Sequence, residues 1–113
     1  MADPDRVIRI HRPYLALIVG GAETVEVRVG YPSTRRIRVG RVPAFESGEE
    51  RCRARVVKVA EYESFEAMLD AEDHRAIAGE DPGRGELLAA CREIHPPEKE
   101  APGVLAIHLR LVP

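Results

Sequence analysis

Gly21-Ala22-Glu23-Thr24-Val25-Glu26-Val27-Arg28 is the most informative stretch of this chain. From Thr24 onward polar residues alternate with valines, and Val29 continues the apolar set. A period of two predicts a strand with one face in a core. If the valines enter the core, then a hydroxyl, a carboxylate and a guanidinium follow one another on the opposite face. That face is either an ordinary solvated surface or the wall of a polar cleft.

The size and composition of the chain predict a globular protein. Its 113 residues are 44% hydrophobic and 32% charged, which suits one domain over residues 1–113 with a single modest core. No apolar run approaches the ~20 residues of a membrane helix, and the N-terminus lacks the apolar segment of a signal peptide. We therefore expect a cytoplasmic protein that does not enter a membrane. Cys52 and Cys91 form no Cys-x-x-Cys pair, so we expect two buried free thiols.

Charge is unevenly distributed along the chain. Residues 1–60 hold 12 basic and 7 acidic side chains, whereas residues 61–113 hold 5 basic and 12 acidic ones. A basic half favours an anionic partner. Of the 17 basic residues 15 are arginine, which suits bidentate phosphate contacts and stacking on bases. A GC-rich genome would produce the same excess of arginine, and this alternative stays open.

Local patterns predict the secondary structure. We expect strands at 7–11, 24–29, 37–39, 42–45, 51–59 and 104–112 and helices at 13–19, 65–72 and 85–94. Pro13 suits the first turn of its helix, and Ser64 is a favourable N-cap. The last strand has apolar residues on both faces at its start, which predicts that it is central in the sheet or covered by a helix. Short, antiparallel-looking strands with inserted helices point to a small, partly open barrel.

The chain resembles the ASCH domain family of the PUA-like superfamily. The family motif Gly-x-Lys-x-x-Glu-x-Arg lies after the first helix and opens the second strand, as residues 21–28 do here. Further similarities are the step Ile37-Arg38-Val39-Gly40, the junction Val59-x-x-Tyr62-x-Ser64-Phe65, the helix end Ile94-His95-Pro96 and the apolar strand after Gly103. The resemblance covers residues 7–112. It implies an α+β fold: a small PUA-like β-barrel of about five to six mostly antiparallel strands, with two or three helices packed around it.

The resemblance also implies a binding cleft for RNA or a nucleotide-like ligand between barrel and helices. Glu26 and Arg28 take the motif's carboxylate and guanidinium positions and are expected to line it. We expect Thr24, Glu23, Arg35 and Glu80 near its rim. Arg28 would hold a phosphate or a base edge, and Glu26 would accept hydrogen bonds from a base or orient Arg28.

Glu23 departs from the family, because lysine usually occupies that position. Relatives that hydrolyse acylated cytidine nucleosides use this lysine with a threonine three residues on and a glutamate before the last helix. The corresponding positions here are Glu23, Glu26 and Glu80, and two of the three do not match. A carboxylate cannot replace a lysine that acts as a cation, so this amidohydrolase activity is not expected.

A metal-dependent ribonuclease is the main alternative to a binding protein. Other relatives are metal-dependent ribonucleases, and Glu23, Glu26 and Glu80 would be the catalytic carboxylates if this protein is an enzyme. Together they would offer oxygen ligands to Mg²⁺ or Mn²⁺, with Arg28 on the phosphate. The bland interpretation, in which Glu23 is a solvated turn residue, is preferred, and no dedicated metal site or other cofactor is expected.

The remaining arginines and two tyrosines extend the predicted ligand contacts. Arg35, Arg36 and Arg38, and the alternating Arg51, Arg53 and Arg55, would follow a phosphate backbone, unless they are solvated partners of nearby glutamates. Tyr31 and Tyr62 would stack on bases. The four histidines are scattered and predict no catalytic or metal site. A third interpretation is a protein-interaction module whose acidic half meets a basic partner.

Overall fold

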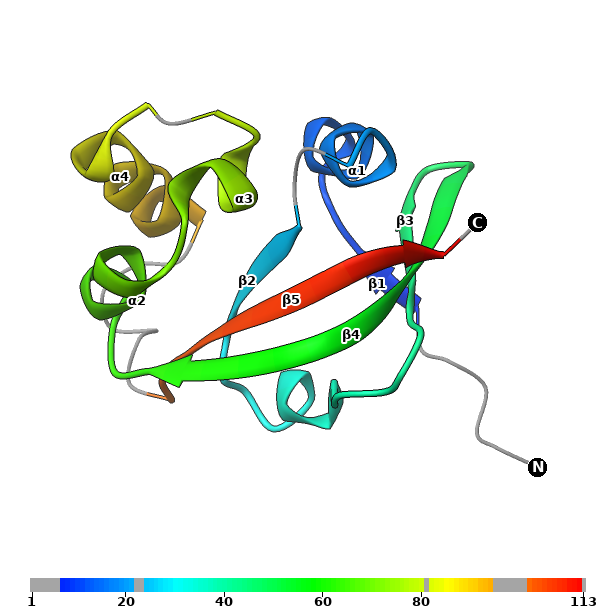
Figure 1. Ribbon diagram of the computed structural model, residues 1–113, viewed down its shortest axis with the longest axis horizontal. Coiled ribbons are helices and arrows are strands. Elements are labelled where there is room, and N and C mark those ends of the chain that lie inside the picture. The colour runs from blue at the N-terminus through cyan, green and yellow to red at the C-terminus, as the bar shows by residue number, and fades with distance from the viewer. Residues whose placement is uncertain (1–6, 22–23, 81, 95–101, 113) are drawn as a thin grey trace.

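The computed structural model describes residues 7–21, 24–80, 82–94 and 102–112 (Figure 1). Its strands are β1 (Val7–Arg9), β2 (Val25–Val29), β3 (Ala44–Ser47), β4 (Glu50–Tyr62) and β5 (Val104–Val112). Its helices are α1 (Arg12–Val19), α2 (Phe65–Ala71), α3 (His74–Ala78) and α4 (Arg84–Ile94), with a 3₁₀ turn, η1 (Thr34–Arg36). Within these residues, no helix has the length and apolar character needed to span a membrane.

The strands form one mixed sheet in the order β1-β3-β4-β5-β2. Three pairings are antiparallel, and β1 runs parallel to β3. The long strands β4 and β5 carry a register shift between Val56 and Lys58, the kind of irregularity that increases the local twist. The sheet curls into a half-barrel whose edge strands are β1 and β2 (Figure 1). This confirms the predicted partly open barrel, and β5 is central as expected.

Each face of the sheet carries its own apolar cluster. Helix α1 covers one face, where Leu15 and Ile18 pack against Phe45 and Ile107. Helices α2, α3 and α4 cover the other face, in a cluster that includes Phe65, Met68, Leu87 and valines of β2. Figure 1 shows α1 on one side of β2 and α3 and α4 on the other. The edge strand β2 therefore runs between two helical layers.

Helix α3 is absent from the sequence-based prediction. The Asp73 side chain accepts a hydrogen bond from the Arg75 N–H at the start of this helix, and Gly79 ends it with a left-handed backbone (φ 81°). A helix of five residues is too short to show a periodic pattern and depends on tertiary packing, here through Ile77. The predicted N-cap of α2 is confirmed, because the Ser64 side chain accepts a hydrogen bond from the Ala67 N–H at 3.1 Å.

The predicted strand at 37–39 is wrong. Residues 34–36 form η1 instead, and Ile37 turns into the first apolar cluster. A turn closed by Arg41 N–H on the Arg38 carbonyl follows, with Gly40 at φ 91°. Because of these turns, residues 37–39 do not pair as a strand. Gly40 and Arg41 nevertheless each share one hydrogen bond with Val56 of β4.

Candidate functional site

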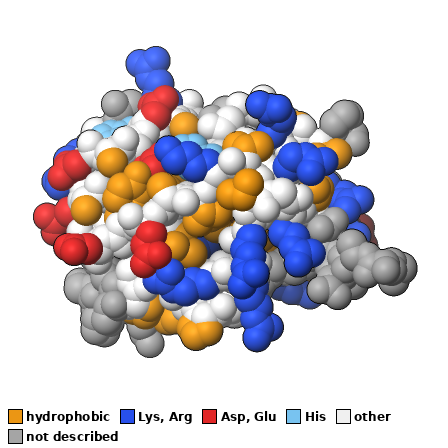
Figure 2. Space-filling view, turned by 60° about the horizontal axis from the view of Figure 1, so that its bottom comes forward, with side chains coloured by type: hydrophobic (Ala, Val, Ile, Leu, Met, Phe, Trp, Pro, Cys, Tyr) orange, Lys and Arg blue, Asp and Glu red, His pale blue; other side chains and the backbone are white. Residues whose placement is uncertain are grey.

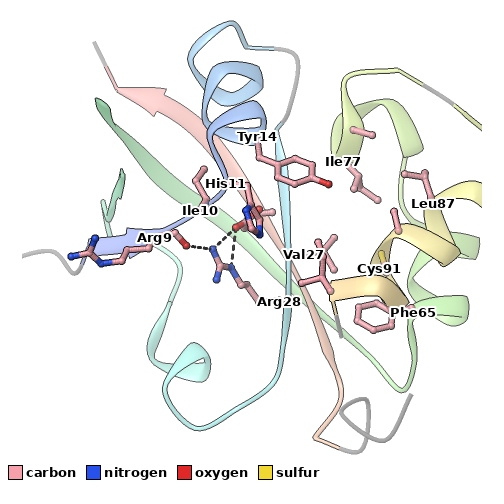
Figure 3. A pocket seen from close by; sticks show the side chains of 14 residues that line it. Arg9, Ile10, His11, Tyr14, Val27, Arg28, Phe65, Ile77, Leu87 and Cys91 are labelled. Carbon is pink, nitrogen blue, oxygen red and sulfur yellow. Dashed lines mark hydrogen bonds and ion pairs between the residues drawn. The ribbon is translucent and has the colours of Figure 1, made fainter. Parts of the chain in front are cut away.

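A pocket of about 370 Å³ lies along the free edge of β2, between the start of α1 and helices α3 and α4 (Figure 3). Its volume falls within the range typical of small-molecule sites. Its lining comes from four parts of the chain: Arg9, Ile10, His11 and Tyr14; Glu26, Val27 and Arg28; Phe65, Ile77 and Ala78; and Leu87, Ala90, Cys91 and Ile94.

The pairing of β2 with β5 explains why three consecutive residues of β2 reach this pocket. Val27 lies opposite Ala106 on the face covered by α2–α4, whereas Glu26 and Arg28 lie opposite Ile107 and Leu105 on the inner face of the half-barrel. The pocket wraps around the strand edge and so receives side chains from both faces. Of the two alternatives for this strand face, the solvated surface does not apply, because Glu26 is only 8% exposed and lines the pocket with Arg28.

Glu26 and Arg28 form an ion pair in the pocket wall. The Arg28 Nε donates to Glu26 Oε2 at 2.9 Å, and its Nη2 lies 2.7 Å from the same oxygen. The Arg28 Nη2 also donates to the Arg9 main-chain carbonyl at 3.1 Å. Because Arg9 ends β1, this guanidinium connects the two edge strands that the sheet leaves unpaired (Figure 3).

Burial controls the charge on Glu26. Loss of water around the carboxyl raises its pKa above the ordinary value, while the charge and hydrogen bond of Arg28 act in the opposite direction. Among the described residues, none donates a hydrogen bond to Glu26 Oε1, and none accepts one from Arg28 Nη1. The pair therefore presents one acceptor and one donor to the pocket, with charges that largely cancel.

The rest of the pocket is mainly apolar. Val27, Phe65, Ile77, Leu87 and Cys91 form one wall, and Figure 3 shows the Tyr14 ring facing Ile77 across the space. The His11 and Tyr14 rings pack edge to face, with centroids 6.3 Å apart. A largely apolar pocket with a few polar groups is typical of sites for small, partly polar ligands.

Several predicted site residues lie away from this pocket. Thr24, Tyr31, Arg35, Arg36 and Glu80 are not among its lining residues, and Glu23 lies outside the described residues. Glu80 is exposed beyond the end of α3 and does not line the pocket that holds Glu26. Tyr31 packs against the apolar cluster under α2–α4. The described residues contain no group of three His, Cys, Asp or Glu side chains arranged to hold a metal ion.

Arg35 has a structural role in this fold. Its Nη1 and Nη2 donate to the two carboxylate oxygens of Glu61 at 2.8 Å each. The same side chain donates to the Gly30 carbonyl at 2.9 Å and to the Pro102 carbonyl at 2.7 Å. The bidentate pair raises the pKa of Arg35 and lowers the pKa of Glu61. These contacts tie the connection between β2 and β3 to the end of β4 and to the residues before β5, and they use most of the N–H donors of the guanidinium.

Sequence reasoning missed most of the pocket's lining. His11 stood among the scattered histidines, while Phe65, Leu87 and Cys91 lay within predicted helices and were not proposed as site residues. The apolar residues of a predicted helix share one face, but the sequence does not show which of them lie beside a cavity. The one available signal was the position of His11 and Tyr14 at the junction of the first strand and helix.

A basic face lies on the exposed surface of β4 and β5. We define it as Arg53, Arg55 and Lys58 of β4 and Arg110 of β5, all exposed. Arg55 lies directly opposite Arg110 in the ladder. No carboxylate of the described residues pairs with Arg55, Lys58 or Arg110. In Figure 2 most Lys and Arg side chains lie towards the centre and right, and acidic ones gather at the left, the side of α2 and α4 in Figure 1.

Solved structures share this fold. The hypothetical protein PH0355 superposes with a TM-score of 0.87 at 24% identity, over 96% of this chain and all of its own length. Protein PF0455 from Pyrococcus furiosus gives 0.79 at 26% identity, over 96% of this chain and 98% of its own. No curated protein shows significant sequence similarity to the chain.

The family comparison bears directly on the motif at β2. The sequence profile of the ASCH domain matches residues 8–112, which includes every strand except the first residue of β1. This match confirms the resemblance seen in residues 21–28 and in the junctions that follow them. With nearly the whole chain matched and the half-barrel observed, this protein belongs to the ASCH domain family.

Proposed function

We propose that this protein binds single-stranded RNA and takes one base into the pocket beside Glu26 and Arg28. ASCH domains are generally considered RNA-binding. The observation that carries the proposal is the pocket itself: an apolar slot of about 370 Å³ with a carboxylate and a guanidinium at one end. Sequence-specific RNA proteins commonly hold unstacked bases in this way, by stacking on rings and hydrogen bonding to base edges.

The ion pair favours a base over a phosphate as the group bound in the pocket. A phosphate needs net positive charge, whereas Arg28 is already neutralised by Glu26 at 2.7 Å. A base edge presents donors and acceptors without a full charge, which suits the free Glu26 Oε1 and Arg28 Nη1. Tyr14 and His11 supply rings at the same end.

The basic face supports a polymer rather than a free nucleoside as the ligand. Like charges directly opposite in a ladder destabilise a sheet, as with Arg55 and Arg110. Phosphates along an RNA strand would neutralise them and release counterions. The proposed partner is therefore RNA, with its backbone on the basic face.

The pocket is tested with a pair of variants on α4. Ala90 lines the pocket, and its neighbour Ala89 is exposed and does not. Fluorescence anisotropy with labelled single-stranded RNA should show a loss of roughly tenfold or more in affinity for Ala90→Phe, since the ring fills space meant for a base. Ala89→Phe should bind like the wild type. Equal binding by both variants would refute a base in this pocket.

The basic face is tested by salt dependence. Replacing Arg55 and Arg110 with Gln should reduce the slope of log affinity against log salt by about 1.4, the value for two phosphate contacts on a single strand. The control is Arg12→Gln with Arg75→Gln, which removes equal charge from α1 and α3. If both double variants reduce the slope equally, the effect comes from net charge alone. That result would contradict an RNA backbone bound on the basic face.

The same RNA reports on the nuclease alternative. Metal-dependent cleavage would require Glu26 with Glu23 or Glu80. Incubation with Mg²⁺ or Mn²⁺ should leave the RNA intact if the protein only binds. Cleavage that is lost in Glu26→Gln would instead establish a ribonuclease in the same pocket.

A further inference from the structure

The outer edge of β2 offers main-chain groups to the pocket. The Leu109 N–H donates to the Thr24 carbonyl at 2.7 Å, and the Gly30 N–H donates to the Gly103 carbonyl at 2.8 Å. In an antiparallel pair, hydrogen-bonded residues alternate with residues whose N–H and C=O point away from the partner. Glu26 and Arg28 therefore direct their N–H and C=O groups to β5, as do the Thr24 carbonyl and the Gly30 N–H. Val25, Val27 and Val29 direct their N–H and C=O groups to the unpaired edge.

Both ends of this edge are closed by other parts of the chain. Beside Val25, the Thr24 N–H donates to the carbonyl of Ala76 in α3, at 2.8 Å. At the other end, the Val29 carbonyl accepts from the Thr34 hydroxyl at 2.5 Å. Val27 lies between them and lines the pocket. None of the described residues hydrogen bonds to its N–H or C=O.

A main-chain N–H and C=O without protein partners in a largely apolar pocket are available to hydrogen bond to a ligand. In an extended strand the N–H and C=O of one residue point the same way, side by side. The Watson–Crick edges of nucleobases carry a donor beside an acceptor in the same manner. Glu26 and Arg28 flank this main-chain pair on one face of the strand, and the Val27 side chain lies on the other (Figure 3).

We propose that the main-chain N–H and C=O of Val27 hydrogen bond to the Watson–Crick edge of the base held in the pocket. This rests on the proposed function and assigns the base-reading groups of that site. Of the three valines whose main-chain groups point to this edge, only Val27 lines the pocket, which suits a single base. An extended peptide adding a strand would need a longer open edge. Val27 thus contributes specificity through its backbone, which side-chain patterns in the sequence do not show.

The first experiment uses the four nucleoside 5′-monophosphates as probes, followed by ¹⁵N–¹H NMR. When the protein is saturated with the nucleotide that binds most tightly, the resonance of the Val27 amide proton should move downfield. It should move more than the resonances of the Glu26 and Arg28 amide protons, which face β5. Methylating the donor nitrogen of that base, such as N3 of uridine, should weaken binding roughly tenfold, because one hydrogen bond is lost and a main-chain carbonyl is left unpaired. A methyl on carbon 5 of the pyrimidine, or on carbon 8 of a purine, should not.

A backbone variant supplies the matched control. Replacing the residue 27 amide with an ester removes its N–H and keeps the side chain, and the same change at Val29 removes an outward N–H beyond the pocket. We expect weaker nucleotide binding for the first ester only. Suppose that a nucleotide binds, but the two ester variants bind it with equal affinity, or the protein binds the two methylated nucleotides with equal affinity. The Val27 assignment is then wrong while the proposed function stands. If no monophosphate binds, or a valine-rich hexapeptide shifts Val27 instead, the assignment and the base pocket both fail.

Discussion

Replacing Arg28 with Ala should destabilise the protein in a way that depends on the ionisation of Glu26. The variant leaves a carboxylate that is 8% exposed without its ion-pair partner. Breaking a buried pair costs 3–5 kcal/mol, and since the Arg28 side chain is 25% exposed we expect a lower value, about 2–3 kcal/mol. For a domain of this size that corresponds to a fall in Tm of roughly 8–12 °C.

The pH dependence gives this prediction its sign. The folded-state pKa of Glu26 is raised by burial, so the folded protein holds that proton more tightly than the unfolded chain. The carboxyl therefore favours folding most at low pH, and this contribution is lost as the pH rises through the folded pKa. Removing Arg28 removes the positive charge and the hydrogen bond that oppose the rise in the pKa of Glu26. The deficit of Arg28→Ala against wild type should therefore be largest at pH 7 and shrink as the pH falls towards 5.

Urea unfolding at several pH values measures the effect, with Glu26→Gln plus Arg28→Ala as the matched control. The double variant has no buried charge, so it should recover about 1–2 kcal/mol at pH 7 relative to Arg28→Ala, within the range of coupling energies for contacting residues. The difference in unfolding free energy between the double variant and the wild type should lack the pH-dependent loss expected for Arg28→Ala, because Gln at position 26 does not ionise. If the single and double variants lose the same free energy with the same pH profile, then Glu26 and Arg28 are not a buried pair and the description of the pocket wall is wrong.

Three further predictions concern groups outside the pocket. The hydrogen bond to Glu72 raises the pKa of Tyr62 to about 12, so one of the three tyrosines should ionise near that pH in an ultraviolet titration, and Tyr62→Phe should abolish this step. The stability from this bond is present below pH 10 and lost as the pH rises through about 12. Gly30→Ala should lower the Tm because a Cβ there would lie 2.6 Å from a main-chain carbonyl, whereas Gly85→Ala meets open space in a helix and should stabilise by up to about 0.5–1 kcal/mol. Arg35→Lys should lower the Tm without changing nucleotide affinity, since a lysine cannot make the bidentate contact; weaker binding at unchanged Tm would instead place Arg35 in the ligand site.

Much of the fold follows from short-range patterns in the sequence. The alternation at 24–29 and the apolar stripes of α2 and α4 report local periodicity, which depends only on backbone geometry. The N-cap at Ser64 and the proline at the start of α1 act over one helical turn. These features, with the motif at 21–28, were sufficient to predict a partly open barrel and its family.

The tertiary structure alone decided where the pocket lies and which residues reach it. The curl of the sheet brings Arg9 within hydrogen-bonding distance of Arg28, 19 positions away, and two helical layers meet at the edge of β2. Glu26 is buried because both faces of its strand are covered, a circumstance that alternation in the sequence cannot report. Arg35 is held by Glu61 and loop carbonyls, and Glu80 is exposed away from the pocket. Each of these outcomes depends on contacts between distant segments, whose geometry forms only when the chain closes on itself.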